Sequence, residues 1–289
     1  MPTPRHLSML AATATTAWAL MAHHGAHAAT SAPYQVGVGM SDITGEAAEV
    51  GMMGYAELTQ KTAGIHQRLR ARAFIVQDAA TQKSAVIVIT DTGLVTQAIH
   101  QAVLKRLAAK YGTLYNAQNV LISATHTHAG PGGYSHYALY NITILGFQKK
   151  TFDAIVDGIV EAIDKAHQSK APGEILLNQG ELTNASRNRS ASAFRLNAAA
   201  DRAAFPQEID PLMSVLTFRQ SGKAVGALSL FPTHGTSMTN QNKLISGDNK
   251  GYAAYHWEHD EAGVNYRADK NPFVAAFAQT NPGDMSPNL

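Results

Sequence analysis

The segment from residue 120 to residue 133 constrains the fold most, because an apolar run leads into alternating histidines and a Gly/Pro turn. The apolar residues 120–124 favour a buried β-strand. Side chains at positions i and i+2 of an extended chain share one face, so His126 and His128 can point into one pocket at the strand's end. The segment therefore predicts a strand that ends in a catalytic metal site. Two polar residues at a strand end are the simpler alternative.

Apolar patterns elsewhere predict further strands and two helices. Continuous apolar runs at 73–76 and 85–89 surround a polar turn, which predicts a hairpin buried on both faces. Three-to-four spacing of apolar residues predicts amphipathic helices over 95–111 and 152–167, with a Pro-Gly pair ending the second. Further strands are expected at 34–40, 174–182, 212–218 and 224–231, and a glycine-rich loop is expected at 42–54. Together these patterns predict an α/β fold of mixed β-sheets with flanking helices, in one domain over 29–289.

The N-terminus has the pattern of an export signal. Arg5 and His6 precede an apolar run at 7–21, and an A-x-A cleavage pattern follows at 26–28. We expect cleavage near Ala28 and a secreted or periplasmic protein. A membrane anchor is the alternative, but polar residues interrupt the apolar run. The chain has no cysteine, so disulfides cannot stabilise it, and its formal charge of +2 gives no basic surface suited to nucleic acid.

Three later segments add candidate site residues. Residues 230–237 repeat the pattern of an apolar strand followed by a histidine beside glycine, which makes His234 a second candidate ligand. A catalytic zinc site ordinarily has three protein ligands, so two histidines alone are not enough. The turn-rich segment 280–288 presents Ser286, although turn residues alone also explain that segment. The polar loop 184–190 carries arginines that could clamp a carbonyl or phosphate oxygen, unless the loop is simply solvated.

Short motifs follow one another over roughly residues 34 to 289. They are Gly54-Tyr55, the THTHAGPGG run, Asn188-Arg189-Ser190, the THGTSM run, the SGDNKGYA run at 246–253 and the NPGDMSPN run near the C-terminus. Taken together and in this order, they resemble the neutral ceramidase family. The resemblance implies a zinc-dependent amidase that hydrolyses the N-acyl bond of ceramide to release sphingosine and a fatty acid.

The resemblance implies a role for each candidate residue. His126 and His234 resemble the two imidazole zinc ligands, and Ser286 resembles the serine that acts at the amide. His128 and Arg189 match the remaining active-site positions. The resemblance further implies that a zinc-bound water takes the serine proton while the metal polarises the carbonyl, which is coherent because zinc lowers the pKa of bound water to about 7. Zinc, His128 or Arg189 would then stabilise the developing oxyanion.

The chain departs from the family pattern at its end, Leu289. Family zinc sites also use a glutamate and a tyrosine downstream of the serine, and an immunoglobulin-like domain follows the catalytic domain. We therefore expect this chain to be the N-terminal part of an incomplete catalytic domain, with the further zinc ligands downstream of Leu289 and little or no activity alone. Local side chains that could complete the metal shell instead are His256, Glu258, His259 and Asp284, and those that could hold a second, structural cation are Asp248 and Asn249.

The candidate residues are compatible with three functions. The leading hypothesis is a secreted zinc ceramidase that acts on ceramide or a related sphingolipid and makes peripheral contact with a membrane. A metallohydrolase acting on another lipid amide or ester is the nearest alternative, because the motifs fix the chemistry better than the acyl chain. A non-catalytic secreted lipid-binding protein is the alternative from a different class, although such a protein would not need Ser286 together with the three histidines.

Overall fold

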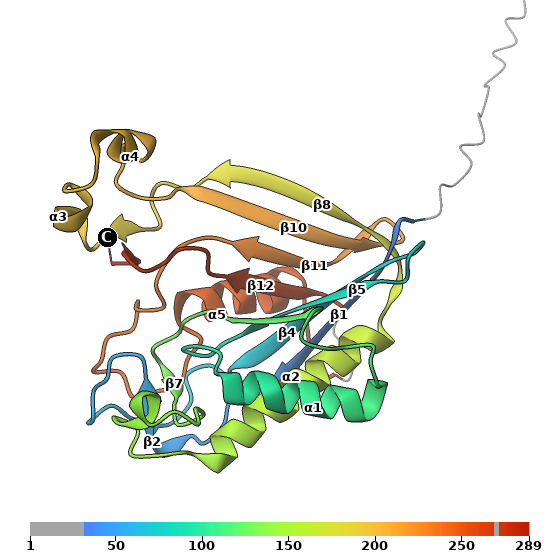
Figure 1. The fold of residues 1–289 in the computed structure, drawn as a ribbon, viewed down its shortest axis with the longest axis horizontal. Coiled ribbons are helices and arrows are strands. Elements are labelled where there is room, and N and C mark those ends of the chain that lie inside the picture. The colour runs from blue at the N-terminus through green and yellow to red at the C-terminus, as the bar shows by residue number, and fades with distance from the viewer. Residues whose placement is uncertain (1–31, 269–271, 289) are drawn as a thin grey trace, which may run out of the picture. The chain divides into compact units, whose positions relative to one another are not determined.

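The computed structural model describes residues 32–268 and 272–288, so the expected signal sequence and the cleavage site near Ala28 lie outside the described residues. These residues form an eight-stranded sheet with strand order β12-β11-β10-β8-β1-β4-β5-β6, together with two small sheets (Figure 1). The strands of the large sheet are β1 (Tyr34–Asp42), β4 (Arg70–Asp78), β5 (Ser84–Thr90), β6 (Val120–Ala124), β8 (Ala171–Glu181), β10 (Leu212–Gln220), β11 (Lys223–Leu230) and β12 (Val274–Ala278).

The small sheets and the helices lie around this large sheet. One small sheet joins β2 (Ala48–Met53), β3 (Lys61–Ala63) and β7 (Gly130–Pro131), and the other joins β9 (Arg187–Asn188) and β13 (Met285–Ser286). The helices are α1 (Gln97–Tyr111), α2 (Lys149–Gln168), α3 (Ala191–Phe194), α4 (Ala199–Ala204) and α5 (Asp248–Tyr255), with a 3-10 turn η1 (Ala138–Asn141) and a π-helical turn η2 (His256–Glu261). Within the described ranges, none of these helices is both long and apolar enough to cross a bilayer.

The mixed α/β class is confirmed, and so is the antiparallel hairpin of β4 and β5. Helix α1 begins at Gln97, two residues after the expected start, because the Thr96 hydroxyl accepts a hydrogen bond from the Ile99 amide and caps the helix. Helix α2 ends at Gln168, so the expectation that Pro172 and Gly173 stop it is wrong: both residues lie inside β8.

The expected loop at 42–54 is a second difference, because β2 lies inside it. This strand pairs antiparallel with β3 and with β7, so partners distant in the sequence supply its backbone hydrogen bonds. Its glycine and methionines lack the β-branched composition by which a strand is usually found, although Val50, Met52 and Met53 are buried. The small sheet places the Gly54–Tyr55 turn beside the histidine segment that follows β6.

Two hydrophobic cores hold the large sheet in place. The first lies between helices α1 and α2 and one face of β4 and β5, where Val103 and Ile159 pack with Ala73 and Val88. The second lies inside the sheet itself, because the half containing β8, β10, β11 and β12 folds over the half containing β1, β4 and β5 (Figure 1). Phe74 of β4 stacks on Phe218 of β10 in this second core, with ring centroids 4.7 Å apart.

This folding brings functional loops from both edges of the sheet to one end. The parallel pairs β5–β6 and β11–β12 are each joined by a helical crossover, through α1 and through α5. Loops that follow the carboxyl ends of parallel strands are the common location of ligand sites in α/β proteins. The histidine segments follow β6 and β11, and the serine segment follows β12.

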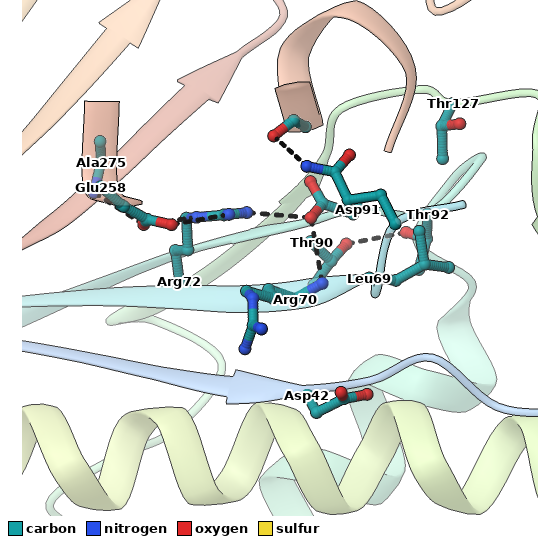
Figure 2. Close-up of polar contacts among 12 residues, drawn as sticks. Asp42, Leu69, Arg70, Arg72, Thr90, Asp91, Thr92, Thr127, Glu258 and Ala275 are labelled. Carbon is teal, nitrogen blue, oxygen red and sulfur yellow. Dashed lines mark hydrogen bonds and ion pairs between the residues drawn. The ribbon is translucent and has the colours of Figure 1, made fainter. Parts of the chain in front are cut away.

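A buried ion cluster ties the two halves together (Figure 2). Arg72 of β4 donates two hydrogen bonds to the Glu258 carboxylate, at 2.8 and 3.0 Å, and a third to Asp91 Oδ2 at 2.9 Å. All three side chains are at most 2% exposed. Glu258 also accepts hydrogen bonds from the Tyr266 hydroxyl and from the Ala275 amide of β12. The cluster therefore joins β4, the residue after β5, the π-helical turn and β12.

Candidate metal centre and active site

Three imidazoles converge where the loops after β6 and β11 meet. The Nε2 atoms of His126 and His234 are 3.0 Å apart, and those of His128 and His126 are 3.3 Å apart. Among the described residues, these three histidines form a group whose candidate ligand atoms all lie within 4.8 Å of one another. The two histidine segments that the sequence singled out therefore come together, as expected.

Backbone pairing between the two loops produces this convergence. Thr127 forms a parallel bridge with Gly235, and the His128 amide donates to the Gly235 carbonyl at 3.1 Å. A Cβ at Gly235 would lie 2.2 Å from the carbonyl oxygen of His126, so a side chain at this position would push the loops apart. His126 itself has φ of +66°, a left-handed conformation that residues other than glycine rarely adopt. The close approach of the loops holds this conformation in place.

The hydrogen bonds of His126 and His234 suit a metal. His126 Nδ1 lies 2.5 Å from the carbonyl oxygen of Gly93, and His234 Nδ1 lies 2.8 Å from that of Pro282. A carbonyl oxygen only accepts, so each Nδ1 carries the proton and each Nε2 presents a lone pair. Lone pairs this close repel each other unless a cation lies between them. Tetrahedral zinc with N ligands at about 2.0–2.1 Å places them about 3.3–3.4 Å apart, which these distances approach.

His128 differs from the other two histidines. Its Nδ1 is buried and has no hydrogen-bond partner within the described ranges, whereas its Nε2 faces the Nε2 of His126 at 3.3 Å. The ring packs against backbone, because a Cβ at Gly54 would lie 2.4 Å from the His128 Cγ, and its edge meets the Tyr55 ring at 4.7 Å. Burial, reinforced by His126, His234 and Arg189, lowers the pKa of His128 to about 3. Burial also lowers the pKa of His234, so neutral imidazoles that can bind a metal prevail at neutral pH.

The serine segment docks onto the His234 loop. The Met285 carbonyl accepts a hydrogen bond from the His234 amide at 2.9 Å, and β13 pairs antiparallel with β9. Ser286 is buried, and the segment expected to be a simple loop contains this short strand. Arg189 follows β9 and donates to the Gly283 carbonyl at 2.8 Å, while its amide donates to the Asp284 carbonyl. The loops that carry all five predicted site residues therefore lie in contact.

The local alternatives for the metal shell have other partners. Glu258 belongs to the buried ion cluster, and His256 and His259 each contact Asp260 on the exposed π-helical turn. Asp284 accepts from Asn188. None of these joins the histidine group among the described residues.

The residues considered for a second cation instead support the His234 loop. Both oxygens of Asp248 accept backbone amides, from Ser237 at 3.0 Å and from Met238 at 2.9 Å. Asn249 donates to the His234 carbonyl at 2.8 Å. The first turn of α5 thus fixes the segment 234–238 from one side, and a cation bound there stays a prediction.

Lys250 is a positioning residue that the sequence reasoning missed. Its buried ammonium donates to the carbonyls of Phe231 at 2.8 Å and Ala278 at 3.0 Å, and so joins the ends of β11 and β12, from which the His234 and Ser286 loops leave. The run 246–253 contains it, but a lysine near a helix start is ordinarily exposed and gives no signal of burial.

The stability of the chain should depend on pH through Lys250. Burial lowers the pKa of Lys250 to about 7, so between pH 7 and 10 the unfolded chain keeps a proton that the folded chain releases. The free energy of unfolding should therefore rise with pH in this range, by up to about 1.4 kcal/mol per pH unit relative to Lys250→Met. Denaturant unfolding at several pH values measures this difference. Parallel curves for the two proteins would mean that Lys250 stays charged in the folded state.

Comparison with known proteins agrees with this geometry. Residues 34–289 match the family model described as "Neutral/alkaline non-lysosomal ceramidase, N-terminal". The chain is 57% identical over 258 residues to the neutral ceramidase of Pseudomonas aeruginosa, covering 89% of this chain and 37% of that protein. It is 55% identical over 256 residues to the neutral ceramidase of Mycobacterium tuberculosis, covering 88% of this chain and 40% of that protein.

A solved structure shows the same fold. The crystal structure of the Pseudomonas aeruginosa neutral ceramidase superimposes with a TM-score of 0.84 at 57% identity, over 89% of this chain and 40% of that one. The chain therefore spans about two fifths of the length of the relatives it matches. The family match over nearly all described residues, and the identity with these relatives, establish that the chain belongs to the neutral/alkaline non-lysosomal ceramidase family.

Proposed function

We propose that the protein containing this chain is a zinc-dependent amidase that hydrolyses the N-acyl bond of ceramide to sphingosine and a fatty acid. The observation that carries the proposal is the convergence of three imidazole Nε2 atoms beside the Ser286 segment, in a chain whose relatives are named neutral ceramidases. Two of the three imidazoles have the protonated Nδ1 that leaves Nε2 free for a metal.

Separate residues would bind the metal, act at the amide and stabilise the developing negative charge. His126 and His234 would hold the zinc, which when bound supplies a Lewis acid for the amide carbonyl and lowers the pKa of water. Ser286 would act at the carbonyl carbon of the amide, and a buried serine needs a nearby base to lose its proton. His128 and Arg189 would donate hydrogen bonds to the oxygen on which negative charge develops. Support for Arg189 comes from its contact with the serine segment at Gly283.

The activity belongs to the longer protein in this proposal. The chain spans about two fifths of its relatives, so we expect it to show little or no turnover alone and to take further zinc ligands from the remaining sequence. A chimera tests this: the chain replaces the matching part of the Pseudomonas aeruginosa relative, and ceramide hydrolysis is measured for the chimera and for the chain alone. We expect turnover only in the chimera, and we expect a zinc chelator to remove it.

The same assay separates the alternatives. Faster hydrolysis of an N-acyl amino acid or a lipid ester than of ceramide would favour a metallohydrolase with another substrate. Tight binding of ceramide without turnover of any of these compounds, in a chimera that contains stoichiometric zinc, would favour a lipid-binding protein.

Export and contact with a lipid surface complete the proposal. The pattern at residues 5–28 supports cleavage near Ala28 and a secreted or periplasmic location, which N-terminal sequencing of exported material tests. Peripheral membrane contact is supported by apolar side chains at and just after η1, where Leu139 and Leu145 are 74% and 72% exposed. Exposed apolar side chains gathered in one segment are typical of interaction surfaces.

A further inference from the structure

A cavity outside the metal centre is lined by basic and aromatic side chains. It has a volume of about 360 Å³, and no residue of the histidine group or of the serine segment contributes to it. Its walls are His66, Gln67, Arg68, Arg70, Arg72, Tyr252, Tyr255 and Tyr266. No carboxylate lines it among the described residues, so its ionisable lining consists of cationic groups, a histidine and phenols.

Arg70 is the one of the three arginines whose charged group is not held by a carboxylate within the described ranges. Arg72 binds Asp91 and Glu258, and Arg68 pairs with Asp42 at 3.0 Å. The Arg70 guanidinium instead lies over the Tyr266 ring, with its central carbon 3.7 Å from the ring centroid. Figure 2 shows it pointing away from the ion cluster. Burial, followed by the charge of Arg72, lowers the pKa of Arg70, so this cation has lost much of its hydration.

Aromatic rings that include Tyr266, the partner of Arg70, form a stack in the wall of the cavity. Tyr255 stacks on His259 at 4.9 Å and on Tyr266 at 6.0 Å, and Tyr252 stacks on Tyr255 at 6.5 Å. Tyr252 and Tyr255 lie on α5, His259 lies on the π-helical turn that follows it, and Tyr266 lies beyond that turn. Segments of π-helix are often found at functional sites. Tyr252 is 58% exposed, so its ring is available to a ligand.

We propose that this cavity is a second ligand site, which binds an oxyanion such as a phosphate ester through Arg70 and packs the apolar part of the ligand against Tyr252 and Tyr255. A guanidinium offers five N–H donors in a planar fork that matches phosphate oxygens. Arg70 has these donors unused among the described residues, and Arg68, which pairs with Asp42, also lines the cavity. The site is separate from the proposed amide hydrolysis and stands whether or not that proposal holds.

The test is a calorimetric titration of the 289-residue chain with inorganic phosphate and with phenyl phosphate. To keep the metal centre from binding the anion, the titration is repeated in His234→Ala. We expect saturable binding in both proteins, with phenyl phosphate bound more tightly because its ring contacts the tyrosines. Arg70→Gln should weaken phenyl phosphate binding about tenfold or more. Lys105→Gln, on helix α1 and away from the cavity, removes the same charge and should leave the affinity unchanged.

Thermal unfolding checks that Arg70→Gln is still folded. Arg68→Gln is a second test variant and should fold normally, because the Arg68 side chain is 59% exposed. Arg68→Gln should weaken binding by a smaller factor. Vesicles of phosphatidylcholine containing phosphatidic acid identify the source of the anion: Arg70-dependent capture means a lipid headgroup, and no capture means a soluble ester. Absence of saturable binding to either phosphate, or equal affinity in the wild type, Arg70→Gln and Arg68→Gln, would overturn the proposal.

Discussion

Replacing Ser286 by alanine in the chimera should lower kcat for ceramide by about 10³-fold or more, because it removes the proposed nucleophile and with it the step that the rest of the site supports. The substitution deletes one oxygen, which among the described residues accepts a hydrogen bond from the Asn288 amide at 3.2 Å, so the fold should be unaffected. Turnover of ceramide, with zinc content measured by atomic absorption, checks both points.

Two controls separate the role of Ser286 from that of the metal. Ser286→Ala should keep its zinc, whereas His234→Ala should lose both zinc and activity, because it removes a proposed ligand whose Nδ1 is held by the Pro282 carbonyl. Ser221→Ala, at an exposed serine in the turn between β10 and β11, should behave like the wild type. Unchanged kcat in Ser286→Ala would exclude the serine mechanism while leaving a metal-dependent hydrolase intact.

Replacing Arg72 by methionine should destabilise the chain by about 3–5 kcal/mol, because it leaves two carboxylates buried without their partner. Asp91 and Glu258 are at most 2% exposed, so neither can recover hydration without opening the second core. Burial already raises the pKa of Asp91 despite Arg72, and two carboxyl groups share one guanidinium. The midpoint and slope of urea unfolding give the change in the free energy of unfolding.

The triple variant Arg72→Met, Asp91→Asn, Glu258→Gln is the matched control. Its amide oxygens still accept from the amides of Arg70 and Ala275, but no buried charge remains. It should therefore be more stable than the single variant, because an apolar or neutral replacement of a whole buried ion cluster costs less than removal of one member. A single variant as stable as the triple one would show that leaving these two carboxylates unpaired costs little.

The sequence predicted the helices and strands whose apolar residues recur at a regular spacing over a short segment. The hairpin of β4 and β5, the helices α1 and α2 and the strands before each histidine follow from hydrophobic periodicity, because burial of one face determines that periodicity. The meeting of His126 and His234 was expected from their equivalent positions after strands, and motif resemblance added Ser286 to them.

Structural features that depend on partners distant in the sequence could not be predicted from local sequence patterns. Arg72 contacts Glu258 across 186 residues, and an arginine inside a strand pattern does not reveal whether a carboxylate will meet it. Lys250 is buried because two strand ends present carbonyls to it, and β2 exists because β7 pairs with it. These cases share one cause, since tertiary contacts override local propensity.

The three-histidine site is built from loops that leave strands near opposite ends of the strand order of one sheet. This arrangement determines when the site can form during folding. His126 and His234 are separated by 108 residues, and such long-range contacts are made late because the chain between them must be ordered first. Metal capture should therefore follow folding of the polypeptide, so that ion starvation should yield a folded protein without metal, which takes up zinc on resupply without renewed synthesis.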